Sequence, residues 1–208
     1  MSVVDVAMVG HLGPAALAAT GMGAMLFWGA LSFMLGVRTA VQTLSARRLG
    51  QKLFHECGIA FNNGVVLALV FGTPISVAGW ILAGKFVPFF IADPIATGLA
   101  VDYASIIFLS LIFSSLSFVF QGFYTGIEKT RLHMNVTVFS NCLNVYLNIG
   151  LIYGTVGIRE FLQNKLPALE WFHLFWAWMD FPALGVPGAA IATVIASAWM
   201  TAHYSLYL

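Results

Sequence analysis

Long apolar runs separated by short polar or charged turns make up most of this chain. The runs cover residues 1–12, 15–44, 58–84, 100–125, 133–153 and 183–207. A helix needs about 20 apolar residues to cross the hydrocarbon core of a bilayer. The pattern therefore predicts an all-α integral membrane protein with six spans, of which the first is too short to cross by itself.

The first run ends at a turn over residues 10–14. The dozen or so residues before this turn would reach only about 18 Å as a helix. No basic residue precedes the run and Asp5 interrupts it, so it does not fit a signal peptide. Either this helix is a half-span or it starts upstream of residue 1, and we favour the second interpretation, a fragment of a longer protein.

The composition supports a membrane protein and disfavours other classes. Hydrophobic residues make up 60% of the 208 positions and charged residues 8%, against about 25% charged in soluble domains. A net charge of +1 without a basic, aromatic-rich patch gives no reason to expect nucleic acid. Cys57 and Cys142 match no metal or redox spacing. An embedded enzyme is the least favoured class, because no hydrolase or metal motif is present.

Charged turns predict the orientation of the spans. Basic residues gather in the connections between the second and third spans and between the fourth and fifth, namely Arg47, Arg48, Lys52, Lys129 and Arg131. Because cytoplasmic loops carry an excess of Lys and Arg, both chain ends are expected in the cytoplasm. The segment 155–182 mixes charges with Trp171, Trp176 and Trp178, and indole prefers the headgroup region. We expect it to be an external interfacial insertion.

Three spans carry polar or small residues at intervals of four, three and four. These stripes are Thr137, Asn141, Asn144 and Asn148; Ser110, Ser114, Ser117 and Gln121; and Ser32, Gly36, Thr39 and Thr43. Each set occupies one face of a helix, and we expect that face to point into the bundle. The stripes either hold helices together, at about 0.6 kcal/mol per hydrogen bond, or line a hydrated cavity. The cavity is favoured for the asparagine stripe, because amides are costly to bury.

Asp5 is a carboxylate inside an apolar run. An ionisable side chain at membrane depth is read as functional by default. If Asp5 faces the asparagine stripe, burial would let it exchange a proton or accept a cation near neutral pH. Arg38 is the other charge at depth, and its long side chain either extends to the cytoplasmic interface or faces substrate.

Five segments, in order along the chain, resemble those of the MATE (multidrug and toxic compound extrusion) transporters, particularly the DinF-like branch of bacteria. They are VDVAMVGHLGPAALAA at 4–19, SARRLG at 45–50, QGFYTGIEKTR at 121–131, NCLNVYLN at 141–148 and GVPGAAIAT at 185–193. The family has twelve helices in two six-helix lobes. The chain therefore resembles the N-terminal lobe with a truncated first helix, and its missing partner would be the C-terminal lobe of the same polypeptide.

The resemblance implies an exporter in the bacterial inner membrane that uses no cofactor. An H+ or Na+ ion moves inward while a small cationic or amphipathic compound moves outward. Cation coupling carries over to Asp5, Asn144, Asn148, Tyr103 and Thr193. The substrate cavity would be lined by Asn141, Gln121, Ser117, Thr137 and Arg38. Asp5 is also a possible Na+ ligand, and no other metal site is expected.

One departure from the family pattern concerns position 148, where many DinF-like members have aspartate and this chain has Asn148. A single carboxylate binds Na+ less readily than two, which favours protons as the coupling ion. Two alternatives to drug export stay open. A flippase for a lipid-linked precursor would need a cationic groove, for which Arg38 is the only candidate, and a membrane scaffold subunit would use the stripes only for packing.

Overall fold

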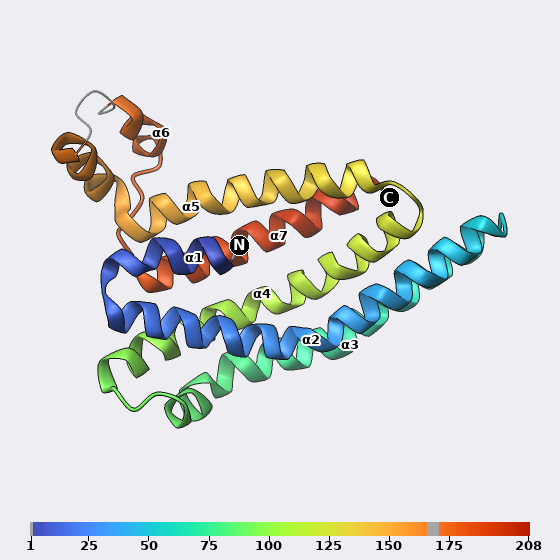
Figure 1. Cartoon of the computed structure of the whole chain (residues 1–208), viewed down its shortest axis with the longest axis horizontal. Helices are drawn as coiled ribbons and strands as arrows, with labels where there is room; N and C mark the ends of the chain where they lie inside the picture. Colours follow the sequence, from blue (N-terminus) through green and yellow to red (C-terminus); the bar gives the residue numbers. More distant parts are fainter. Residues whose placement is uncertain (1, 166–170) are drawn as a thin grey trace.

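The computed structural model describes residues 2–165 and 171–208, which are almost entirely helical. The elements in chain order are α1 (Ser2–Val9), η1 (Gly10–Leu12), α2 (Pro14–Gly50), α3 (Phe54–Phe86), η2 (Val87–Phe89), α4 (Pro94–Gly126), α5 (Thr130–Lys165), α6 (Leu174–Ala177) and α7 (Val186–Ser205) (Figure 1). Within this described part, five helices have the length and hydropathy of membrane spans: α2, α3, α4, α5 and α7.

α2, α3, α4 and α5 are longer than the apolar runs that reveal them, whereas α7, with 20 residues, is shorter than the run 183–207. α2 has 37 residues and α4 has 33, which corresponds to about 55 Å and 50 Å at 1.5 Å per residue. The helices continue beyond the hydrocarbon core of the bilayer into the membrane–water interface. An apolar run in the sequence marks only the part of a helix that lies in the hydrocarbon core. α1, by contrast, has 8 residues and begins half-way along the bundle, where the N-terminus lies in Figure 1.

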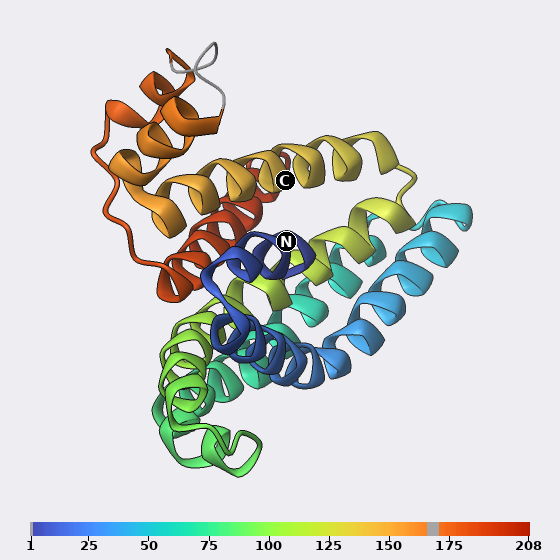
Figure 2. The same cartoon turned by 60° about the vertical axis from the view of Figure 1, so that its left-hand side comes forward.

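The helices form one layered bundle in which α4 is central. α4 packs against α2, α3 and α7, while α5 packs against α7 and against α1 (Figures 1 and 2). Glycine permits the close contact between α2 and α4: a Cβ added at Gly122 would lie 2.4 Å from the carbonyl oxygen of Arg38. Small residues at crossing points are the usual means by which membrane helices approach each other.

The connections alternate between the two ends of the bundle. The α2–α3 and α4–α5 connections and the C-terminus lie at one end, and η1, η2 and the α5–α7 connection lie at the other (Figure 1). We call these the inner and outer ends, after the charge pattern of their loops. The inner end carries an ion pair between Arg48 and Glu56, which joins the end of α2 to the start of α3.

α5 changes direction at Gly154, which has φ 70° and ψ 163°. This left-handed conformation favours glycine, and an added Cβ would lie 2.8 Å from the backbone nitrogen of Ala183. The helix then continues to Lys165, whereas the apolar run predicts an end near residue 153. Residues 155–164 and 171–185, hereafter the outer segment, therefore include one further helical stretch and the short helix α6.

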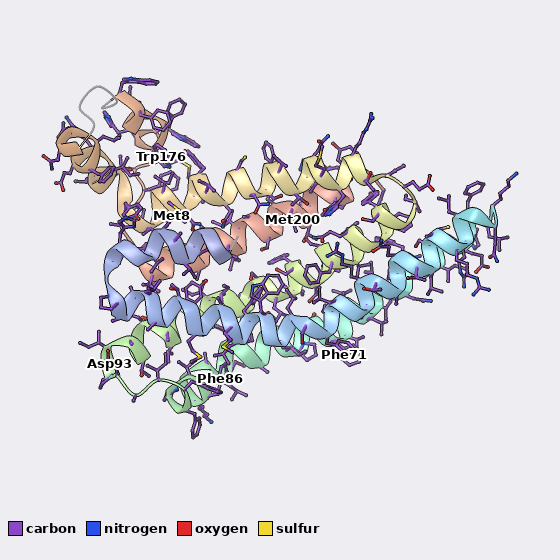
Figure 3. All side chains as sticks on the ribbon, in the orientation of Figure 1. Met8, Phe71, Phe86, Asp93, Trp176 and Met200 are labelled. Carbon is purple, nitrogen blue, oxygen red and sulfur yellow. The ribbon has the colours of Figure 1, made fainter. Side chains whose placement is uncertain are left out.

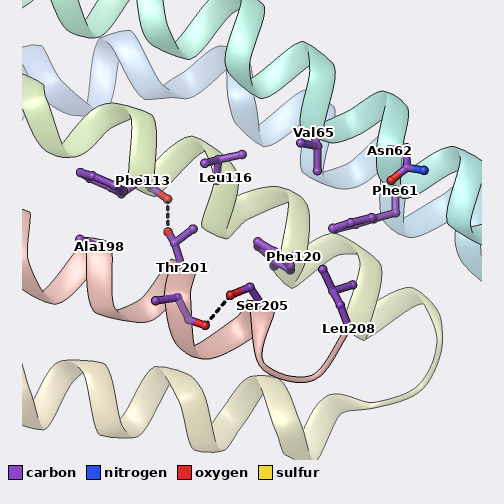
Figure 4. Close-up of a pocket in the computed structure, with 11 residues that line it drawn as sticks. Phe61, Asn62, Val65, Phe113, Leu116, Phe120, Ala198, Thr201, Ser205 and Leu208 are labelled. Atoms are coloured by element: carbon purple, nitrogen blue, oxygen red, sulfur yellow. Dashed lines mark hydrogen bonds between the residues drawn. The ribbon is translucent and has the colours of Figure 1, made fainter.

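A cavity of about 420 Å³ lies between α3, α4 and α7 near the inner end (Figure 4). Phe61 of α3 and Phe113 and Phe120 of α4 line one side, and Thr201 and Ser205 of α7 line the other. Both hydroxyls donate to backbone carbonyls, Thr201 to Phe113 at 2.8 Å and Ser205 to Ala202 at 2.7 Å. Thr201 therefore links α7 to α4, whereas the Ser205 hydroxyl is satisfied within α7.

Candidate functional site

Asp5 is fully buried and lies where α1 meets α5 and α7. Its side chain is 0% exposed. Asn148 of α5 donates from Nδ2 to one carboxylate oxygen at 2.6 Å, and Thr193 of α7 donates its hydroxyl to the other at 2.8 Å. The carboxylate thus joins three helices through its two oxygens.

Asn144 extends this arrangement by one turn of α5. Its Nδ2 donates to the Thr193 hydroxyl oxygen at 3.2 Å, and its Oδ1 accepts from Asn148 Nδ2 at 3.3 Å. Asn144 and Asn148 are four residues apart and therefore share one helix face. The four residues Asp5, Asn144, Asn148 and Thr193 form a closed hydrogen-bonded group, which we call the Asp5 cluster.

Close contact between α5 and α7 allows the Asp5 cluster to form. A Cβ added at Gly188, near the start of α7, would lie 2.3 Å from the carbonyl oxygen of Leu151 on α5. α1 is fastened next to the same site, because the Tyr153 hydroxyl of α5 donates to the backbone oxygen of Met8 at 2.7 Å (Met8 is labelled in Figure 3). The geometry therefore depends on small residues in α7 and on a tyrosine in α5.

Two buried oxygen atoms next to the Asp5 cluster have no hydrogen-bond partner within the described residues. They are Asn148 Oδ1 and the hydroxyl of Tyr103. Tyr103, on α4, is 0% exposed and lies close enough to Asp5 for their charges to interact. Its ring packs where α2 has Gly23, at which an added Cβ would lie 2.4 Å from the ring. Buried polar atoms are normally satisfied, so these two are available to a proton, a cation or water.

In the described part of the chain, Asp5 forms no ion pair with a cationic side chain. A buried carboxylate without a countercharge is costly to keep ionised. The neutral donors Asn148 and Thr193 offset part of that cost. The site is thus arranged so that adding a cation to it is favourable, whether that cation is a proton bound covalently or a metal ion held by oxygen atoms.

A second polar group lies toward the inner end and was not anticipated as a unit. His133 Nδ1 lies 2.6 Å from the hydroxyl of the fully buried Tyr204, and the Thr137 hydroxyl lies 3.3 Å from the same nitrogen. Arg38 interacts electrostatically with His133 and Tyr204, and its guanidinium lies 5.8 Å from the Phe118 ring centre. We call His133, Thr137, Tyr204 and Arg38 the inner cluster.

The inner cluster shows what the sequence interpretation missed. Tyr204 and His133 are not among the site residues that the sequence indicates. Tyr204 stacks on Phe120 with ring centres 5.5 Å apart and accepts from the Tyr124 hydroxyl at its backbone oxygen at 3.1 Å. A tyrosine and a histidine facing each other from the inner ends of two spans, 71 positions apart, leave no local pattern in the sequence.

The remaining residues predicted for the substrate cavity are separated by the fold. Ser117 lies 2.9 Å from Thr201 and so bonds α4 to α7. Gln121 is 8% exposed on α4. Asn141 donates to the backbone oxygen of Thr137 at 2.9 Å, which places it on α5 between the two clusters. Thus α5 presents a continuous polar face from the inner cluster to the Asp5 cluster.

The stripe on α2 does not point into this bundle, so that expectation was wrong. Its members Ser32, Gly36, Thr39 and Thr43 are all exposed. Ser32 and Thr39 donate to carbonyl oxygens of their own helix, at 2.7 Å from Gly29 and 2.9 Å from Leu35. The stripe therefore satisfies its hydroxyls locally and leaves a polar, small-residue face on the surface of the described bundle.

Comparison with known proteins places this arrangement in a family. A family model described as MatE matches residues 1–149. The chain belongs to the MATE family. Its members are membrane transporters and not enzymes. Among curated relatives, the multidrug resistance protein NorM of Burkholderia vietnamiensis is 27% identical over 209 residues, covering 100% of this chain and 40% of the relative.

Another relative and two solved structures agree. The probable multidrug resistance protein NorM of Photorhabdus laumondii is 32% identical over 167 residues, covering 77% of this chain and 35% of that protein. A crystal structure of MATE in the bent conformation has a TM-score of 0.80 at 22% identity, covering 100% of this chain and 40% of the other. An inward-facing multidrug resistance MATE transporter has a TM-score of 0.78 at 21% identity, covering 99% and 40%.

These matches establish the fold as one lobe of a MATE-type transporter. The chain spans about two fifths of the length of the relatives that it matches. The relatives named NorM do not specify the DinF-like branch, which stays a prediction from the motifs.

Proposed function

We propose that this chain acts as the N-terminal lobe of a secondary active exporter, in which cation entry at Asp5 drives the outward movement of a small cationic or amphipathic compound. The relatives carry the name multidrug resistance protein. The other half of the transporter would be a second six-helix lobe. Transporters built from two repeats of this kind work by alternating access around sites near the bilayer midplane.

The observation that carries this proposal is the complete burial of Asp5 among neutral hydrogen-bond donors. Asp5, Asn148 and Thr193 come from three different helices. A change in the charge of one carboxylate therefore alters the contacts of all three helices at once. α1 supplies the carboxylate itself, and after η1 its connection to α2 passes through Gly13 at φ 114°.

The proton is the coupling ion that this site fits better. When Asp5 is ionised, Asn148 Nδ2 donates to it at 2.6 Å, while Asn148 Oδ1 has no partner among the described residues. A protonated Asp5 would need an acceptor, and rotation of the Asn148 amide would bring Oδ1 into that position. Asparagine can thus bond to both charge states, whereas a second carboxylate would favour a metal cation.

We place the substrate path along the polar face of α5, between the Asp5 cluster and the inner cluster. Asn141 and Thr137 are half-buried there, Gln121 and Ser117 lie on α4, which contacts α5, and Arg38 lies on α2. Aromatic rings such as Tyr124 and Phe120 attract cationic compounds. Arg38, held over the Phe118 ring, would oppose the same cations and could thereby favour their release.

The orientation that we propose puts the inner end in the cytoplasm. Arg47, Arg48 and Lys52 lie at the α2–α3 connection, and Lys129 and Arg131 lie at the α4–α5 connection, both at that end. The C-terminus of the described chain would then be cytoplasmic, and so would the start of the first helix if it continues upstream. Since the relatives are bacterial, the membrane would be the inner membrane.

The proposal is tested by transport in vesicles. The complete transporter that contains this chain is reconstituted and loaded with a fluorescent lipophilic cation, and then either a proton gradient or a sodium gradient is imposed. We expect the proton gradient alone to drive export. Export driven only by sodium would overturn the choice of ion, and no gradient-driven export of any cationic or amphipathic dye would overturn the proposed function.

A further inference from the structure

A cavity of about 360 Å³ separates the outer segment from the bundle. Ligand pockets in proteins usually measure about 300–1,000 Å³, so it is large enough to hold a molecule. The part of α5 before Gly154 provides one wall, and the outer segment provides the other. The lining of the cavity includes Ile149, Tyr153, Gly157, Phe161, Phe172 and Trp176. It lies apart from the Asp5 cluster and from the inner cluster.

The walls of this cavity are almost wholly hydrocarbon and aromatic. Tyr153 and Trp176 are lining residues with polar atoms, but the Tyr153 hydroxyl already donates to Met8 and the Trp176 indole already donates to the Tyr146 backbone oxygen at 2.9 Å. Ordered water needs two to four polar partners, which these walls do not offer. His11 is exposed at the edge and supplies an imidazole. An apolar ligand with a polar end fits this distribution.

The outer segment lies beside the part of α5 that precedes Gly154, and not beyond the end of that part. Tyr146 of α5 holds the outer segment in place. The Tyr146 hydroxyl donates to the Phe175 backbone oxygen at 2.7 Å, and the Trp178 indole donates to the Tyr146 hydroxyl at 2.8 Å. Tyr146 precedes Gly154 by eight residues, which is about 12 Å of helix. Trp176 accordingly lies next to the outer part of α5 in Figure 3. The cavity therefore opens at the depth of the outer membrane half.

The outward surface of the outer segment matches the lipid-facing surface of the spans. Trp171, Phe175 and Trp178 are 56%, 53% and 71% exposed. On α5, Val145 and Phe139 are 36% and 51% exposed. Exposed indoles at the end of a spanning helix favour the region of lipid headgroups. The cavity thus lies under a cover that is itself in contact with lipid.

We propose that this cavity is a lipid site, which takes one acyl chain of a lipid from the outer half of the bilayer. The chain would lie between α5 and the rings of Phe172 and Trp176, with the polar end of the lipid near His11. The lipid would fill the space between the outer segment and α5. This site is separate from the proposed transport function.

Fluorescence quenching of Trp176 by brominated lipid tests the proposal. Trp176 lines the cavity but is only 5% exposed, so bromine reaches it efficiently only from inside. Every other tryptophan of the complete transporter is replaced by phenylalanine, which in this chain means Trp28, Trp80, Trp171, Trp178 and Trp199. The protein is reconstituted in phosphatidylcholine with bromine at mid-chain or without bromine. We expect the brominated lipid to remove more than half of the Trp176 emission.

A glycine in the cavity wall gives the decisive variant. Among the described residues, a Cβ at Gly157 would meet the Tyr153 Cβ alone, at 3.8 Å, so Gly157→Leu fills the cavity without a clash against them and should relieve the quenching. Gly98→Leu is the matched control: it also lies toward the outer end, on α4, with nothing within 4 Å of its added Cβ. The control should stay quenched, and both variants should keep the thermal midpoint of the parent protein.

Two results would overturn the lipid site. One is a Trp176 emission that is equal in brominated and ordinary lipid. The other is strong quenching that Gly157→Leu leaves unchanged, which would mean that bromine reaches the indole from outside the cavity. Because no ion gradient is applied, neither result depends on whether the protein transports.

Discussion

The polar stripes of α5 and α2 have the same spacing but opposite surroundings. On α5, Asn144 and Asn148 are 1% and 0% exposed and bond to groups of other helices. On α2, Ser32 and Thr39 are exposed and bond to carbonyls of their own helix. Hydroxyls can be satisfied within one helix, whereas a primary amide has donors and acceptors that need further partners. Between α5 and α2, the chemical type of the residue therefore indicated the buried stripe better than its spacing, but it does not distinguish the stripe of α4, whose Ser110 and Ser117 are buried hydroxyl residues.

The strongest test of this contrast is Asp5→Asn. Asparagine keeps the shape of the side chain and one oxygen that can accept from Asn148, while its NH2 group would face the Thr193 hydroxyl, which can turn to accept, so the fold should hold. It cannot change its charge, and we therefore expect export by the complete transporter to fall to the level of empty vesicles. Dye efflux is measured at matched protein amounts. Efflux at the unaltered rate would show that the buried stripe does not serve coupling.

Two variants, Gly188→Ala and Gly36→Ala, compare the packing at the two stripes. Gly188 of α7 contacts α5 next to the buried stripe, and Gly36 belongs to the exposed stripe of α2. At Gly188 the new Cβ would lie 2.3 Å from the Leu151 carbonyl oxygen, so α7 must move away from α5. We expect a loss of about 3 kcal/mol in stability. At Gly36 nothing lies within 4 Å, and alanine should be neutral or gain up to about 1 kcal/mol. Thermal midpoints in detergent measure both, and equal midpoints would contradict the packing described.

Thr193→Val sharpens the role of the buried stripe without touching Asp5. Valine preserves the volume but removes the hydroxyl that donates to Asp5 at 2.8 Å. The proton-driven export rate should fall about tenfold, which is about 1.4 kcal/mol. Thr201→Val is the control, since Thr201 is on the same helix and its hydrogen bonds within the described part of the chain go to Phe113, Ser117 and Ser197, not to Asp5. Equal losses in both variants would indicate a general loosening of α7.

The smallest effect is expected on the α2 stripe. Ser32→Ala and Thr39→Val each remove a hydrogen bond within one exposed helix turn. Stability of the isolated chain in detergent should change by less than about 0.5 kcal/mol in either case. A larger loss would contradict the description of these hydroxyls as bonded only within their own helix turn.

Much of the fold could be read from the sequence because hydropathy marks the hydrocarbon depth of each span. The convergence of Asp5 with the amides of α5 also followed from the sequence, since one carboxylate in an apolar run has few places to be satisfied. Thr193 was reached only through the family resemblance, because a threonine near a helix start has no distinctive pattern.

The misplaced features share a physical cause. The orientation of the α2 stripe depends on which neighbours cover it, and helical period does not specify neighbours. The continuation of α5 past Gly154 depends on a single left-handed residue, which from the sequence looks like a helix end. His133 and Tyr204 meet only because α5 and α7 have a particular separation at the inner end.

The return of the chain to α5 has a consequence for how this lobe can vary in length. After the outer segment, Leu184 and Gly185 donate their backbone N–H groups to the carbonyls of Leu151 and Ile152, at 2.8 and 3.2 Å. The chain thus returns to α5 beside Leu151 and Ile152, close to Gly154, where the outer segment begins. Insertions or deletions between these points would leave Asn148 and Thr193 in register, so the size of the excursion is free to change independently of ion coupling.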